Sequence, residues 1–235
     1  MVKIYLDAGH GGKDSGAINT GMNLKEKDLV LDICRRIEAG LKDFENVQVL
    51  TTRTTDVFLS LDERTQKANK ANCDVLLSVH INSAPSASGR GFESHIYPNS
   101  GSATVAYQNV MHQEILKAIS GSAVPDRGKK QSNFHMLRES KMKAILTENL
   151  FVSNPTDAKL LASDAFRQKL ADGHVNGLAA FLGLKRLERP PKEAKPEVGG
   201  KLYRVQVGAF EDKENAEALA ADLTRQGYRP LVKYE

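Results

Sequence analysis

Four residues that lie far apart in the chain could together carry out metal-assisted hydrolysis: His10, Glu26, His80 and Glu148. Two histidines and one carboxylate are a common ligand set for catalytic zinc, and this set leaves one position open for water. A further carboxylate that does not bind the metal can take the proton of that water. The residue types therefore fit a site for one Zn²⁺, with His10, Glu26 and His80 as ligands and Glu148 as the proton acceptor.

The positions of these residues in the chain favour their meeting in space. His10, His80 and Glu148 each follow a short run of apolar and β-branched residues, which is typical of a buried strand. In open α/β sheets, sites form at the carboxyl ends of strands. Glu26 falls in the first turn of a predicted helix, from which it could join the other three.

Each of the four residues also has an ordinary structural interpretation. The two histidines could cap a turn and end a strand, and Glu26 could be a helix-capping carboxylate. Glu148 could pair with Arg138 or Lys143. Because the candidate ligands are separated by tens of residues, their spacing alone is a weaker signal than two histidines on one helix, and both interpretations stay open.

The elements that must position these residues read as an α/β domain with a twisted, largely parallel sheet flanked by helices. Apolar runs predict strands at 2–7, 47–52, 74–81, 91–98, 134–137 and 143–151. A helix is expected after an N-cap at Asn23, and further helices at 60–72, 103–119 and 154–182. Ser60 and Glu63 have the spacing of a capping box.

The C-terminal part of the chain differs in composition from this domain. We expect a domain at 1–183, followed at 184–200 by a linker that contains three prolines among charged residues. Order is expected to resume at 201–235 as one β-α-β unit, with strands at 203–207 and 228–234 around a helix at 215–226.

The composition argues against several classes of function. The 235 residues carry a formal net charge of +4, and no segment is basic enough to indicate a nucleic-acid surface. Cys34 and Cys73 are expected to be reduced and buried. No apolar run suggests membrane insertion, and no secretory signal precedes the first strand, so we expect synthesis in the cytoplasm without a signal peptide.

Residues 1–182 resemble the zinc-dependent N-acetylmuramoyl-L-alanine amidases of the third amidase family. The resemblance rests on six motifs in order, DAGHGG at 7–12, LKEKDL at 24–29, TRTTD at 52–56, LDERT at 61–65, SVHIN at 78–82 and ENLFVSN at 148–154. Two residues depart from the family pattern, since Ala8 stands where proline is common and Leu150 where glycine is common.

The resemblance implies a zinc-peptidase-like fold and hydrolysis of the amide bond between N-acetylmuramic acid and L-alanine in bacterial peptidoglycan. It also implies that His10, Glu26 and His80 bind zinc and that Glu148 is the catalytic carboxylate. These are the residues that the chain's own pattern singles out.

Other polar residues have weaker claims to a role in the site. Asn82 is a candidate to support His80. Arg53 and Arg64 are candidates to bind substrate, but ion pairs that hold the fold are the more usual role for such arginines. His135 falls in the strand predicted at 134–137, which would line the cleft.

Residues 201–235 are similar to the start of the sporulation-related (SPOR) repeat, through KLYRVQVGAF at 201–210 and NAEA at 215–218. The resemblance implies binding to peptidoglycan. Because this family normally uses two β-α-β halves and the chain has one, we expect a homodimer through the half-repeat, a mobile tail, or a remnant that binds nothing.

Two other functions are compatible with the sequence. The same scaffold could act as a zinc exopeptidase, or the chain could be a catalytically inactive wall-binding protein. An amidase without a signal peptide would act on the wall after cell lysis or release through holin-type holes, as an endolysin or a sporulation or autolytic enzyme.

Overall fold

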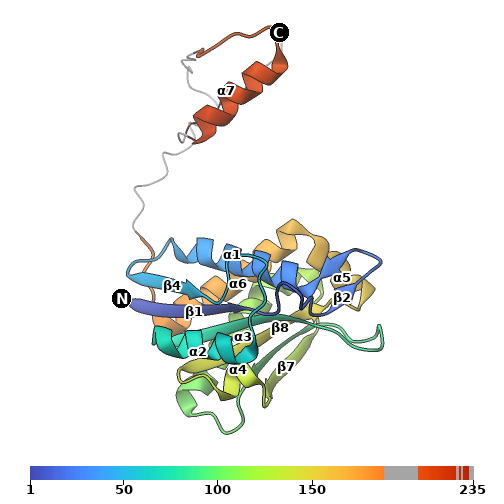
Figure 1. The fold of residues 1–235 in the computed structure, drawn as a ribbon, viewed down its shortest axis with the longest axis vertical. Helices are drawn as coiled ribbons and strands as arrows, with labels where there is room; N and C mark the ends of the chain where they lie inside the picture. Colours follow the sequence, from blue (N-terminus) through green and yellow to red (C-terminus); the bar gives the residue numbers. More distant parts are fainter. Residues whose placement is uncertain (188–205, 226–227, 229, 233–235) are drawn as a thin grey trace. The chain divides into compact units, whose positions relative to one another are not determined.

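The computed structural model describes residues 1–187, 206–225, 228 and 230–232 (Figure 1). The chain divides into two units, Met1–Glu188 and Arg189–Glu235, and each is described by itself.

A six-stranded sheet forms the centre of the first unit, in the order β4-β1-β5-β8-β6-β7. The strands are β1 (Val2–Ala8), β4 (Val47–Thr51), β5 (Val75–Asn82), β6 (Phe92–Ile96), β7 (Asp126–Gln131) and β8 (Lys143–Phe151). Neighbouring strands run parallel except for β6 and β8, which pair antiparallel. The predicted α/β fold with a largely parallel sheet is confirmed.

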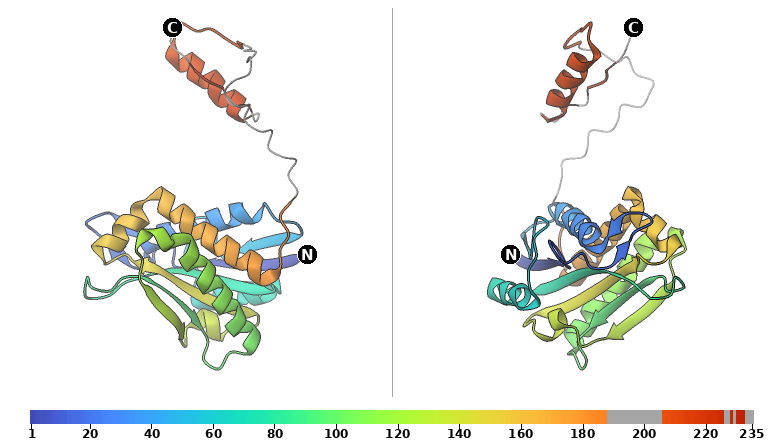
Figure 2. Two further views of the ribbon diagram at one scale, coloured as in Figure 1. Left: turned by 180° about the vertical axis from the view of Figure 1, so that it is seen from behind. Right: turned by 45° about the vertical axis from the view of Figure 1, so that its right-hand side comes forward.

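One face of the sheet is covered by the long helices α1 (Glu26–Leu41), α3 (Ser102–Ile119) and α6 (Asp164–Leu182). Figure 2 shows α3 and α6 packed side by side. Ile33, Leu77 and Met111 are among the fully buried side chains of this core. Burial of this much apolar surface is the main stabilising contribution to the sheet and its helices.

The opposite face of the sheet carries less cover, from α2 (Leu61–Ala71) and the single turn α4 (His135–Arg138). Its apolar cluster is smaller and includes Leu76, Met136 and Leu146.

The starts of two helices test the predicted caps. Ser60 and Glu63 form the expected capping box of α2. The cap expected at Asn23 is wrong, since α1 begins at Glu26 and Lys25 at its N-cap makes no side-chain bond. Asn23 instead has a φ of 52°, beside a short hairpin formed by β2 (Ile18–Asn19) and β3 (Leu24–Lys25).

Two predictions between residues 120 and 182 need correction, and one strand there was missed. The strand predicted at 134–137 is the helical turn α4, and the strand β7 was not predicted. The helix predicted at 154–182 is two helices, α5 (Pro155–Ala162) and α6, separated at Ser163, whose side chain caps α6. A short 3-10 turn, Ser120–Ser122, follows α3.

The predicted linker 184–200 begins inside the first unit. The amide of Glu45 donates to the carbonyl of Lys185 at 2.9 Å, and the amide of Leu187 donates to that of Asp43 at 2.8 Å. The rest of the predicted linker lies outside the described residues.

The described residues of the second unit contain α7 (Lys213–Arg225), where a helix was predicted at 215–226. Parts of the two flanking predicted strands are described, at 206–207 and at 228 and 230–232, and these residues are not in strands. The remaining parts of those strands lie outside the described residues. Among the helices that are described, none has the length and apolar character that crossing a bilayer requires.

Candidate metal centre

Three side chains from different elements converge at the carboxyl end of the sheet. His10 follows β1, Glu26 is the first residue of α1, and His80 lies near the end of β5. One carboxylate oxygen, Oε1 of Glu26, lies 3.1 Å from Nε2 of His10 and 3.0 Å from Nδ1 of His80. All three ligand atoms lie within 4.8 Å of one another. Sequence reasoning therefore identified three residues that the fold brings together.

The Glu26 carboxylate is fixed by the backbone on both of its oxygens. Oε1 accepts a hydrogen bond from the amide of Ile81, and Oε2 accepts one from the amide of Ala17, each at 2.9 Å. The side chain is almost fully buried. Glu26 therefore serves the site and does not cap its helix.

Asp14 orients His10 and was not singled out from the sequence. Its Oδ2 lies 2.9 Å from Nδ1 of His10, on the side of the ring away from Glu26. Histidines that bind a metal usually donate their second ring nitrogen to a carboxylate or carbonyl, which fixes the tautomer. Nothing in the glycine-rich segment 9–16 marks this one aspartate in advance.

Glycines make room for these rings. A Cβ on Gly9 would lie 2.4 Å from Cε1 of His80, and one on Gly16 would lie 2.5 Å from Oε2 of Glu26. Gly16 also has a φ of +60°, a conformation that costs other residues free energy. The packing of side chains against bare backbone explains why the motif around His10 is rich in glycine.

The protein itself perturbs the pKa values of the cluster. Burial lowers the pKa of His80, but the hydrogen bond and charge of Glu26 outweigh this and raise it to about 9. The pKa of His10 is also raised, because Glu26 and Asp14 outweigh burial. The pKa of Glu26 lies far below its ordinary value, because the two histidines outweigh its burial.

Arg64 holds the turn that carries His10. Its guanidinium forms a buried ion pair with Asp7 at 2.9 Å and donates to the carbonyl oxygens of Ala8, at 2.7 Å, and of His10. Burial opposes ionisation of Asp7, but the charge of Arg64 outweighs it and lowers its pKa. Arg64 therefore supports the fold, and its donors are not free to bind substrate.

Arg53 has a similar role, through bonds to backbone carbonyl groups. Its buried guanidinium donates to carbonyl oxygens at 2.8 to 3.1 Å, those of Ala8, Gly9, Lys27 and Thr55. It joins the His10 turn to the first turn of α1, so it fixes the distance between two elements of the site.

Glu148 lies on β8 beside the three converging residues. Its Cα is paired with that of His80 on β5, so the two side chains lie on the same face of the sheet. Its Oε2 is buried and has no hydrogen-bond partner among the residues that the structure describes. Burial raises the pKa of Glu148 to about 7. The possible partners Arg138 and Lys143 bind elsewhere, to 133 and 139 and to the carbonyl of Asp74.

The remaining candidates lie near the site but contact other groups. The Asn82 amide donates to Oε1 of Glu93 at 3.0 Å, and so supports that carboxylate and not His80. His135 lies on α4, with Nε2 3.3 Å from Oδ1 of Asp62 and 3.4 Å from Oγ1 of Thr65. It therefore joins α4 to α2 and does not lie on a cleft-lining strand.

A mostly apolar hollow of about 280 Å³ opens beside His10 and His80. Phe58, Leu61 and Met136 contribute its apolar wall. This hollow gives the cluster access from one side, along the loop that precedes α2.

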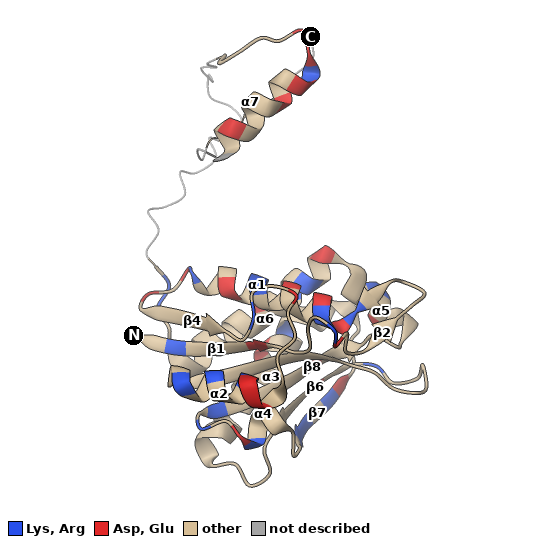
Figure 3. Ribbon diagram, in the orientation of Figure 1, with Lys and Arg blue, Asp and Glu red and all other residues tan. Residues whose placement is uncertain are grey.

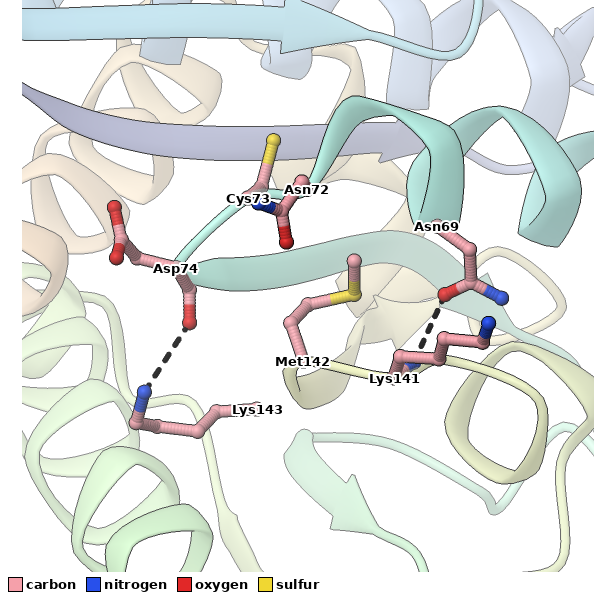
Figure 4. Close-up of a pocket in the computed structure, with 7 residues that line it drawn as sticks. All are labelled: Asn69, Asn72, Cys73, Asp74, Lys141, Met142 and Lys143. Carbon is pink, nitrogen blue, oxygen red and sulfur yellow. Dashed lines mark hydrogen bonds between the residues drawn. The ribbon is translucent and has the colours of Figure 1, made fainter.

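A second hollow, of about 330 Å³, lies at the opposite end of the strands (Figure 4). Its lining includes Asp74 and Lys143, which lie at the amino ends of β5 and β8, whereas His80 and Glu148 lie toward their carboxyl ends. Its polar groups bond to one another, as in the 2.9 Å bond from the Lys141 amide to Oδ1 of Asn69. It is separate from the cluster of histidines.

Comparison with protein families gives two matches. Residues 4–180 match the family model described as N-acetylmuramoyl-L-alanine amidase, and residues 175–234 match the SPOR domain. The two matches overlap at 175–180, which lies within α6 of the first unit.

Curated relatives cover most of the chain. The chain is 43% identical over 233 residues to the sporulation-specific N-acetylmuramoyl-L-alanine amidase of Bacillus subtilis (strain 168). This match covers 99% of the chain and 84% of that protein. The chain is 44% identical over 201 residues to the endolysin of Bacillus phage SPP1, covering 83% and 73% of the two.

Solved structures share the fold of the first unit. The catalytic domain of CwlV, an N-acetylmuramoyl-L-alanine amidase from Bacillus (Paenibacillus) polymyxa var. colistinus, superposes with a TM-score of 0.74 at 34% identity, covering 79% of this chain and 100% of that one. The N-acetylmuramoyl-L-alanine amidase of Clostridium difficile 630 gives 0.74 at 31% identity, covering 77% and 97%.

Proposed function

The chain belongs to the N-acetylmuramoyl-L-alanine amidase family, and we propose that it hydrolyses the amide bond between N-acetylmuramic acid and L-alanine in bacterial peptidoglycan with the help of one zinc ion. His10, Glu26 and His80 would hold the ion, and Glu148 would move the proton. The observation that carries this proposal is the convergence of the three ligand atoms beside the unpartnered carboxylate oxygen of Glu148.

The donor set suits zinc. Bonds of roughly 2.0–2.2 Å in a tetrahedron put neighbouring ligand atoms about 3.3–3.6 Å apart, and the oxygen of Glu26 lies 3.0–3.1 Å from the two nitrogens. Two imidazoles disfavour magnesium and calcium, which prefer oxygen ligands. The bond between His10 and Asp14 is the outer support that zinc-binding histidines generally have.

When bound, zinc supplies Lewis acidity toward the carbonyl group of the scissile amide. Glu148 acts on the proton. Its Oε2 accepts a proton from the attacking water as the water oxygen bonds to the carbonyl carbon. The same carboxyl then gives this proton to the nitrogen as the carbon–nitrogen bond breaks, which releases the amine of L-alanine. A pKa of about 7 suits a group that must both accept and release a proton at neutral pH.

Two other functions remain as outcomes of the test. A zinc exopeptidase would use the same four residues, and an inactive wall-binding protein would have no use for Glu148. The match of 175–234 to the SPOR domain supports wall binding by the second unit. Its described residues give no support to the homodimer expected from a single half-repeat.

End-group analysis of digested peptidoglycan tests the proposal. The zinc-loaded protein should release new N-terminal alanine without new reducing sugar ends, and the Glu148→Gln variant should release almost none. Release of free amino acids from peptide ends would favour an exopeptidase. No new ends with zinc bound, on several wall types, would contradict catalysis.

A further inference from the structure

A second charged cluster lies beside Glu148 on the same face of the sheet. Glu93 on β6 is the Cα partner of Glu148 on β8, and its side chain is buried. Oε2 of Glu93 accepts bonds from Nε of Arg127 and Nζ of Lys130, each at 2.6 Å. Oε1 accepts the bond from Asn82. The proposed mechanism uses none of these residues.

A β-bulge turns both cations toward this face. Between Phe92 and Ser94 the pairing register shifts, because these three residues of β6 lie opposite the four residues of β7 from Asp126 to Lys129. Gly128 lies in this interval with a φ of +85°. Bulges re-aim side chains and are frequent next to active sites. Here the bulge is what places Arg127 and Lys130, three residues apart, on one carboxylate.

The residues that flank the bulge on the other face bind α3. Asp126 pairs with His112 at 2.9 Å, and Lys129 donates to Oδ1 of Asn109 at 2.6 Å. The side chains at 126 and 129 therefore point toward α3, and those at 127 and 130 point toward the site.

The cluster carries one more positive charge than Glu93 can neutralise. The Arg127 and Lys130 side chains are 35% and 38% exposed, whereas Glu93 is 5% exposed. Burial lowers the pKa of the adjacent His95, so this histidine adds no charge at neutral pH. Figure 3 shows the basic residues along β7.

Distance and direction relate this surface to a substrate at Glu148. With a strand spacing of about 4.8 Å, β7 lies roughly 10 Å from β8, or about three residues of extended peptide. The Arg127 guanidinium reaches back toward β8, with its Cζ 4.7 Å from the centre of the Phe151 ring. On the other side of the histidines lies the mostly apolar hollow lined by Phe58 and Met136.

We propose that Arg127 and Lys130 bind a carboxylate of the peptide stem, at the second or third residue from the scissile amide. This inference rests on the proposed function, because it takes the bond beside Glu148 as the one cleaved. The enzyme then favours stems whose carboxyl group is free over stems in which it is amidated. If the two cations only neutralise Glu93, no such preference exists.

Paired substrates test the inference. A soluble muramoyl peptide is prepared with the second-residue carboxyl free or as its amide, and a second pair differs at the third residue. For at least one pair, the zinc-loaded wild type should show a kcat/KM about three- to tenfold higher on the acid, mainly through KM. Equal values for both pairs would overturn the inference.

Variants on β7 separate binding from structure. Lys130→Met and Arg127→Gln should each reduce the acid-to-amide ratio toward one, and Lys130→Arg should largely restore it. The matched control is Lys129→Met, on the same strand but bonded to α3, and it should keep the wild-type ratio. Equal losses on acid and amide in both test variants would indicate a purely structural role and overturn the inference.

Binding measurements keep this test independent of the proposed function. If the zinc-loaded wild type exposes a new N-terminal alanine on none of the substrates, the proposed function fails. Calorimetric titration of the acid and amide peptides then decides the inference alone. Tighter binding of the acid that is lost in Lys130→Met supports it, and equal affinities contradict it.

Discussion

The Glu26 carboxylate lies between two imidazoles, and it favours their protonation as well as the binding of a metal. Its charge and hydrogen bonds raise the pKa of His80 to about 9, so the ring is protonated at neutral pH when no metal is bound. A metal ligand must be a neutral imidazole. Zinc and protons therefore compete for the same site.

This competition predicts a pH-dependent affinity for zinc. Below about pH 9 His80 must lose its proton on binding, and at lower pH His10 must also lose one, so the apparent affinity should rise by at least about tenfold per pH unit between pH 6 and 8. Competition with a chelator at several pH values measures this, and calorimetry in buffers of different ionisation enthalpy counts the protons released. An affinity that does not change with pH would contradict the prediction.

Replacement of Glu148 should separate zinc binding from catalysis. Glu148→Gln keeps the shape of the side chain but cannot accept the proton, so kcat should fall by about 10²–10⁴-fold. Metal analysis should still find one zinc per chain, because Glu148 is not among the three converging residues. A variant with near-wild-type turnover would exclude Glu148 as the proton acceptor.

The same substitution should stabilise the metal-free protein in alkaline solution. The pKa of Glu148 is raised from 4.5 to about 7 in the fold, so its ionisation costs stability as the pH rises through this range. At pH 8, Glu148→Gln should raise the free energy of unfolding by about 3 kcal/mol, since each unit of the pKa difference corresponds to about 1.4 kcal/mol. At pH 4 both side chains are neutral, and denaturant titrations of the two proteins should then agree. A similar difference at both pH values would assign the effect to packing.

The four central residues were predictable from the sequence because three lie at or near the start or end of a recognisable element, and Glu148, which lies within β8, follows the apolar residues of that strand. Asp14 and Glu93 were not, for a physical reason. Each becomes meaningful only when a distant partner is known, His10 across a turn for one and Glu148 across an antiparallel strand pair for the other. A single charged residue in a loop or strand carries no local sign of that partner.

At the scale of the element, the glycine-rich turn after β1 leaves the space that the side chains of the site occupy. We predict that Gly16→Ala lowers the affinity for zinc by about tenfold or more, since its Cβ would meet Glu26 at 2.5 Å and His10 at 2.7 Å. The positive φ should also cost about 1–2 kcal/mol of stability.

Gly183→Ala is the matched control for this substitution. Gly183 has a φ of +63°, close to that of Gly16, but a Cβ there would meet nothing within 4 Å. Both variants should therefore lose similar stability in thermal unfolding, and only Gly16→Ala should lose zinc in a chelator titration. Equal zinc affinity in the two variants would show that the turn can shift to accommodate a side chain.

Elements were predictable where burial sets their pattern. The interior strands β1, β5 and β8 each contain a run of buried, mostly apolar residues, whereas β7 lies at the edge of the sheet and reads Asp-Arg-Gly-Lys-Lys-Gln. Nothing in that sequence alternates between apolar and polar residues. The opposite error at 134–137 arose because Met136 and Leu137 are buried residues of α4 itself, and one helical turn offers too few residues to reveal its period.

At the scale of the whole chain, the first unit contains every residue proposed for catalysis. We predict that a variant of residues 1–188 has a kcat/KM within about twofold of the full chain on a soluble muramoyl peptide. If the second unit binds peptidoglycan, this variant should sediment less with insoluble walls. A large loss of activity on the soluble substrate would contradict the independence of the first unit.

A shorter variant, residues 1–183, provides the control for where the unit ends. It lacks the bonds of Lys185 and Leu187 to the turn at 43–45. Its melting temperature should therefore be lower than that of 1–188, while the zinc site remains intact.

The charged strand β7 also affects whether copies of the protein associate through their sheet edges. An edge strand exposes unpaired backbone groups to which another sheet can add, and lysines and bulges are common defences against such association. β7 has both, so the side chains proposed to select the substrate also guard the sheet against aggregation. Replacing them to broaden specificity would leave a less charged edge, and the solubility of the protein limits how far its substrate preference can be changed there.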